Sequence, residues 1–92
     1  MELEAIKALL SYVSEPVELA IYEKEVRDIP WMAQRIKKVK PCPDCTHLRL
    51  YFDDFHFLAV PFNSLVSFTK DTWTTFDADS RLYYGIRKER LI

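Results

Sequence analysis

The chain has 92 residues, of which 49% are apolar and 29% are charged, and its formal net charge is −1. This length and composition predict one folded domain over residues 1–92 and exclude a disordered chain. The single glycine, Gly85, excludes the glycine-built phosphate loops, because each of those needs at least two glycines.

Charge is arranged in alternating blocks along the chain. Residues 1–28 have a net charge of −4, residues 29–49 of +4, residues 50–80 of −4 and residues 81–92 of +3. We expect these blocks to pair with one another across the fold. The near-neutral total argues against a protein that binds polyanions without regard to their sequence.

Two features predict the compartment. The longest run of apolar residues and proline, residues 57–62, is too short to span a membrane, and the N-terminus lacks the basic and apolar regions of a signal peptide. Cys42 and Cys45 are the only cysteines, which is too few for a disulfide framework. We therefore expect a cytoplasmic protein without a membrane partner, because free thiols persist in reducing compartments.

The first predicted element is a helix over residues 2–13, where apolar residues recur at helical spacing from Leu3 to Val13. Residues 15–29 are ambiguous. Their apolar residues fit one face of a helix over residues 15–27, but the first of them also alternate as in a strand. The helix is the favoured interpretation.

A third, short helix is predicted from Asp28, its N-cap, to Lys40. Proline is compatible with the first turn of a helix, and Pro41 would end this one. Trp31 and Ile36 would lie on its apolar side, with lysine and arginine side chains on the other. The first 41 residues are therefore predicted to be mainly helical.

From Thr46 the apolar period changes to two, which predicts strands. A two-residue turn at residues 53–54 would pair Leu50 with Phe57 on one apolar face. Gly85, inside the last strand, indicates a bulge or a close approach to the backbone. The predicted fold class is α+β, with two or three N-terminal helices followed by an antiparallel β-meander of about five strands over residues 46–52, 55–60, 65–70, 72–77 and 81–87.

The sharpest local motif is the C-P-D-C segment of residues 42–45, followed closely by His47. Two thiolates at this spacing can bind one Zn²⁺, so the candidate metal ligands are Cys42, Cys45 and His47. In the predicted hairpin, the other histidine, His56, lies roughly 13 Å from His47 at about 3.3 Å per residue. One chain is therefore not expected to complete a four-ligand zinc site, whereas two chains could complete one between them.

The same tetrapeptide resembles the C-P-x-C active-site motif of the thioredoxin and glutaredoxin superfamily. In that superfamily the motif follows a strand and begins a helix, whereas here it follows a predicted helix and leads into a predicted strand. Redox catalysis is therefore not expected. Neither histidine has a serine or cysteine nucleophile in a recognisable motif, so the chain is predicted to be a non-enzyme that needs no cofactor.

Tyrosine and arginine side chains are predicted to share one face of the strands, and Trp31 to anchor a basic helix. The candidate partner-binding residues are Trp31, Arg35, Lys38, Arg49, Tyr51, Arg81, Tyr83 and Arg87. Such residues dominate protein interfaces, so the favoured function is a small binding or regulatory module that contacts a protein partner or a second copy in a homodimer. The alternatives are single-stranded nucleic-acid binding through the arginine and tyrosine face, and a zinc-binding module that uses the cysteine pair.

Overall fold

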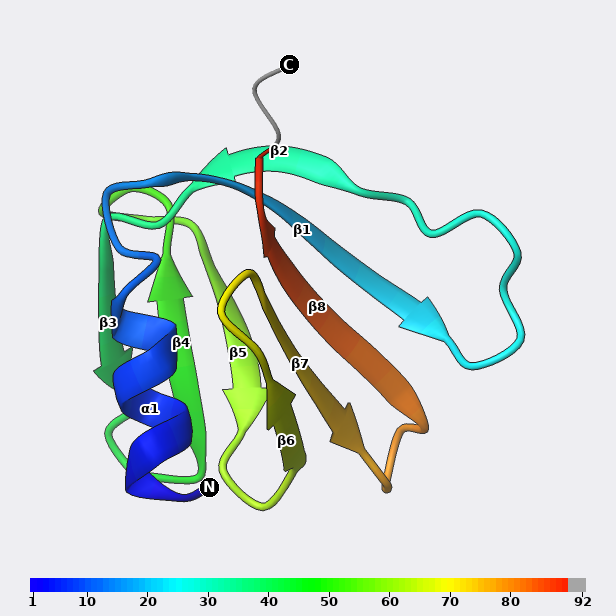
Figure 1. The fold of residues 1–92 in the computed structure, drawn as a ribbon. Helices are drawn as coiled ribbons and strands as arrows, with labels where there is room; N and C mark the ends of the chain where they lie inside the picture. Colours follow the sequence, from blue (N-terminus) through cyan, green and yellow to red (C-terminus); the bar gives the residue numbers. More distant parts are fainter. Residues whose placement is uncertain (90–92) are drawn as a thin grey trace.

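The computed structural model describes residues 1–89, and this part of the chain is mostly β-structure (Figure 1). Its helix is α1 (Leu3–Leu10), and it packs against two antiparallel sheets. The five-stranded sheet has the order β2 (Met32–Arg35), β1 (Pro16–Glu23), β8 (Leu82–Lys88), β7 (Thr72–Asp77) and β6 (Leu65–Phe68). The three-stranded sheet has the order β3 (Lys38–Pro41), β4 (His47–Tyr51) and β5 (Phe57–Pro61).

The predicted fold class is wrong, because the structure is two antiparallel sheets with one short helix rather than two or three helices followed by a meander. The helix predicted over residues 15–27 is wrong, because these residues form strand β1 and the start of the loop that follows it. This strand lies between β2 and β8, so both of its edges are hydrogen-bonded. On one face Leu19 packs into the core between the sheets, and on the other Ala20 pairs with Gly85, over which the Trp31 ring lies. Leu19 and Ala20 are therefore both buried, and a strand that is apolar on both faces resembles a helical stripe.

The helix predicted from Asp28 to Lys40 is also wrong, since these residues form a loop followed by β2 and β3. Between the two strands the chain passes from one sheet to the other at Ile36, which is fully buried. Ile36 also forms an isolated parallel bridge with Val13. These long-range contacts override the local helical pattern.

The strands predicted from residue 46 onward are present at nearly the predicted positions, but they do not form one meander. The first two, β4 and β5, pair with β3, whereas β6, β7 and β8 belong to the larger sheet. The chain crosses between the sheets at residues 62–64. There the buried Ser64 donates its hydroxyl to the Pro61 carbonyl oxygen at 2.6 Å and accepts a hydrogen bond from Thr75.

The β4–β5 hairpin differs from its predicted register by one residue. Leu50 lies opposite Leu58 rather than Phe57, and the turn is longer than the two predicted residues. The Asp53 carboxylate stabilises this turn by accepting the backbone N–H groups of Phe55 and His56, both at 2.7 Å. Because a shift of one residue exchanges the two faces of a strand, Phe57 points away from the core.

The core lies between the two sheets and is closed on one side by α1 (Figure 1). The indole of Trp73 is fully buried, and its Nε1–H donates to the Ala5 carbonyl oxygen in α1 at 2.9 Å. Leu9 of the same helix packs into this core. Within residues 1–89, no helix is long and apolar enough to cross a membrane.

Candidate functional site

The predicted partner-binding residues do not share one face, because the structure divides them between two sheets. Trp31, Tyr83 and Arg87 contact one another or common neighbours on the outer face of the larger sheet. Three others, Lys38, Arg49 and Tyr51, lie together on the smaller sheet. The remaining two are separate: Arg35 donates to the Ser14 carbonyl oxygen, and Arg81 lies in the exposed β7–β8 turn.

On the larger sheet, the aromatic rings pack on one another and on the backbone. Tyr22 stacks on Tyr83 with ring centroids 5.4 Å apart, and Trp31 lies over Gly85. A Cβ atom at Gly85 would lie 3.0 Å from the Trp31 ring, which confirms the close approach predicted at this glycine. Arg87 lies 4.1 Å from the Trp31 centroid and pairs with Glu18 at 3.0 Å, so its charge is already balanced.

On the smaller sheet, two cations cover two rings. The Arg49 guanidinium lies 4.5 Å from the Phe57 centroid and donates to the Tyr51 hydroxyl at 3.2 Å. The Lys38 ammonium lies 4.9 Å from the Tyr51 centroid. Stacked bases need an open ring face, and here each ring has one face occupied by a cation.

The C-P-D-C turn between β3 and β4 holds one buried and one exposed thiol, Cys42 and Cys45. The Cys42 thiol donates to Asp44 Oδ1 at 2.7 Å and accepts the His47 backbone N–H at 3.3 Å. Hydrogen bonds from Cys42 and from Thr46 lower the pKa of Asp44 to about 2. This network of hydrogen bonds orders the turn.

The metal prediction gains no support from the geometry of a single chain. Among the residues that the structure describes, no group of three or more histidine, cysteine, aspartate or glutamate side chains could hold a metal ion. The ring of His47 contacts the Thr46 hydroxyl at 2.8 Å, and His56 contacts Asp53 at 2.8 Å. A zinc site completed between two chains remains a prediction.

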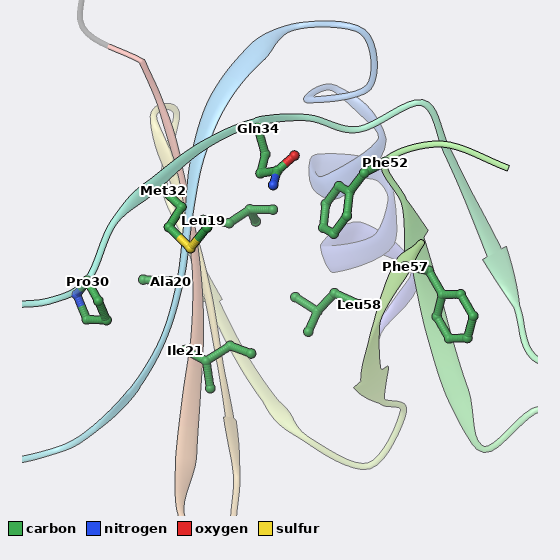
Figure 2. Close-up of a pocket in the computed structure, with 9 residues that line it drawn as sticks. All are labelled: Leu19, Ala20, Ile21, Pro30, Met32, Gln34, Phe52, Phe57 and Leu58. Atoms are coloured by element: carbon green, nitrogen blue, oxygen red, sulfur yellow. The ribbon is translucent and has the colours of Figure 1, made fainter. Parts of the chain in front are cut away.

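One concave site was not predicted from the sequence. It is an apolar groove of about 360 Å³ between the two sheets. Figure 2 shows Phe52 and Leu58 on one side and Leu19, Ile21 and Met32 on the other. The lining residues are Leu19, Ala20, Ile21, Pro30, Met32, Gln34, Phe52, Phe57 and Leu58.

Two further hollows extend the groove at its ends. The loop-side hollow shares Ile21 and Pro30 with the groove and continues to Glu23, Glu25 and Val26. The turn-side hollow shares Gln34, Phe52 and Phe57 with the groove and continues to Asp53, Phe55 and His56. The three hollows therefore adjoin one another through shared lining residues, and together they are called the track below.

Sequence reasoning missed this groove for two reasons. Leu19 and Ile21 were assigned to a helix, and the hairpin register placed Phe57 rather than Leu58 toward the core. The alternation of Val17, Leu19 and Ile21 was the available signal, because it fits a strand with these side chains on one face.

Comparisons of this chain with protein-family models, with curated proteins and with solved structures gave no match. The groove and its surroundings are therefore the basis for a proposed function.

Proposed function

We propose that this protein is a non-enzymatic binding module that holds an apolar segment of a protein partner in the groove between its sheets. The observation that carries this proposal is the concentration of exposed apolar side chains at the groove. Nine large apolar side chains are exposed among residues 1–89, and five of them line the groove or its end hollows. These five are Ile21, Val26, Met32, Phe55 and Phe57.

Grouped apolar exposure supports binding because soluble proteins rarely expose large contiguous apolar patches without a partner. The lining of the groove also favours binding over chemistry, since Gln34 is its one polar side chain. The track, which continues beyond the groove into two further hollows, suits a polypeptide segment better than a compact small molecule. The free thiols of Cys42 and Cys45 suit a reducing compartment, and we propose a cytoplasmic location.

Nucleic-acid binding has less support. The cations on the smaller sheet, Lys38 and Arg49, stack on rings within the protein. On the larger sheet, Arg87 is paired with Glu18. A single-stranded nucleic acid would need both open rings and free cations.

The test is selection of peptides from a random library on the immobilised protein, followed by affinity measurement with groove variants. We expect enriched peptides to contain several apolar residues. The double variant Ile21→Ser/Met32→Ser should weaken their binding by at least tenfold, since each buried apolar side chain contributes about 1.5–3 kcal/mol.

The matched control is Leu3→Ser/Leu65→Ser. It also removes two exposed apolar side chains, but neither of them lines the groove. Equal weakening by both double variants would contradict the proposal, and so would a selection without apolar enrichment. Tight binding of single-stranded RNA that falls steeply with added salt would instead support the nucleic-acid alternative.

A further inference from the structure

We infer that the groove selects a polypeptide segment whose apolar residues are flanked by lysine or arginine. This inference rests on the proposed function and specifies the chemistry of the partner. It follows from the charges that border the groove. The three hollows are lined by the acids Glu23, Glu25 and Asp53 and by no lysine or arginine, while Arg49 lines a fourth hollow that shares only Phe57 with the groove.

The acids lie at the two ends of the track rather than along it. Glu23 and Glu25 line the loop-side hollow with Ile21 and Val26. Asp53 lines the turn-side hollow, on the other side of the groove. A segment that places apolar side chains in the groove would therefore bring the residues before and after them close to carboxylates.

These carboxylates are exposed. Among residues 1–89, neither Glu23 nor Glu25 has a basic partner within ion-pairing distance. Asp53 contacts His56 at 2.8 Å, and the backbone N–H groups that it accepts lower its pKa. The end acids can therefore attract cations from a partner.

Neighbouring bases only partly balance this charge. The segment 23–28 contains three acids and two bases, Lys24 and Arg27, neither of which lines a hollow. At the turn, Asp54 is paired with Lys37 at 2.7 Å and with Lys38 at 4.0 Å, whereas Asp53 has no lysine or arginine within ion-pairing distance among residues 1–89. Each end of the groove therefore presents at least one carboxylate without a lysine or arginine partner.

Charge at exposed positions affects selectivity and association rate more than total affinity. An exposed ion pair changes affinity by about two- to fivefold, and this effect is screened by salt. With one or two pairs at each end, a basic-flanked segment should bind roughly tenfold or more tightly than an acidic-flanked one at low salt. Adding salt should reduce this ratio.

The experiment uses three synthetic peptides with blocked ends and the same central run of apolar residues. One peptide has two lysines at each end, one has two glutamates and one has two serines. Affinities are measured by fluorescence anisotropy at low and moderate salt. We expect the order lysine, serine, glutamate, with a lysine-to-glutamate ratio of about tenfold or more.

The key variant is Glu23→Lys/Glu25→Lys, and its matched control is Glu4→Lys/Glu15→Lys. Both change the net charge equally, but the control acids are exposed residues that line none of the three hollows. The key variant should reverse or abolish the preference for lysine, and the control should keep it. Asp53→Asn, which retains an acceptor oxygen for the turn, should reduce the ratio about two- to fivefold.

The outcomes separate this inference from the proposed function. Peptides that bind equally whatever their flanks, but weakly to Ile21→Ser/Met32→Ser, would overturn the charge inference and leave the groove as a binding site. Equal effects of the key variant and its control would also overturn it. Absence of binding by all three peptides would instead count against the proposed function. Self-association of the protein that is lost in Ile21→Ser/Met32→Ser would assign the groove to a second copy and overturn both.

Discussion

The space between the two sheets opens on two sides, and only one of these openings is covered. On one side α1 covers the core, and Leu9 is 0% exposed. On the other side, the part of the chain described in the structure leaves Ile21 at 44% and Met32 at 62% exposure. An eight-residue helix is long enough to cover only one of the openings. The comparison indicates that stability depends on the helix-covered side, while the open side is available for binding.

The largest effect is expected at Trp73, where α1 meets the larger sheet. Replacing Trp73 with alanine should destabilise the protein by about 3–5 kcal/mol, because it leaves a cavity and removes the hydrogen bond to the Ala5 carbonyl. This loss is comparable with the whole stability of many domains. Urea denaturation followed by circular dichroism measures it. A loss below about 1 kcal/mol would show that the helix does not depend on this contact.

A second prediction compares the buried and the exposed face of α1. Leu9→Ala should cost about 2–5 kcal/mol, since the side chain is fully buried. Leu10→Ala is the control at the neighbouring position, where the side chain is 48% exposed, and it should cost less than about 1 kcal/mol. The same denaturation measurement applies to both variants. Equal losses would mean that α1 is rotated about its own axis, so that Leu9 and Leu10 are buried to a similar extent.

A third prediction concerns Gly85, whose backbone is covered by the single side chain of Trp31 rather than by a helix. Gly85→Ala should destabilise the protein by roughly 1–3 kcal/mol, because its Cβ would press against the Trp31 ring. In the double variant Trp31→Ala/Gly85→Ala the two effects should not add, since the clash is removed. Additive losses in a double-mutant cycle would contradict this contact.

On the open side, stability should change little. Ile21→Ser/Met32→Ser should lower the free energy of unfolding by only about 1 kcal/mol or less, because both side chains are already exposed to water. The same variant is expected to weaken peptide binding strongly. A loss as large as that of Leu9→Ala would show that the groove is part of the core rather than a binding surface.

The smallest effect concerns pH and lies away from both openings, in the C-P-D-C turn. Asp44 has a pKa of about 2 in the folded protein and 3.8 as the ordinary value. Its contribution to stability is therefore present above pH 3.8 and is lost as the pH falls toward 2. Carbon-detected NMR titration should show this low midpoint. Cys42→Ala removes the main donor and should move the midpoint upward, and an unchanged midpoint would contradict the hydrogen bond.

The error in the hairpin register could have been avoided from the local sequence. Asp53 stands two residues before Phe55 and three before His56, a spacing at which an aspartate side chain accepts backbone N–H groups. That capped turn contains more than two residues. Recognising it would have moved Phe57 to the outer face and Leu58 to the core.

The assignment of β1 and the residue that contacts Gly85 could not be predicted from neighbouring residues. β1 is buried on both faces because Leu19 packs into the core and Ala20 pairs with Gly85 of the distant strand β8, over which the Trp31 ring lies. The close approach at Gly85 was predicted, but the residue responsible, Trp31, comes from the β1–β2 loop. Pairing between distant segments decides such contacts, and periodicity within one segment carries no information about it.

The sequence by itself determined the start of the helix and the positions of the strands after residue 46, because helical spacing and alternation are local properties of these segments. Only the tertiary structure decided that the strands divide between two sheets, that β1 is a strand, and that a groove with acidic ends remains open opposite α1. Each of these depends on which distant residues bury one another's apolar surface. The hydrophobic effect is non-directional and does not specify which apolar residues meet. A sequence pattern can therefore show that a side chain is apolar without showing what will cover it.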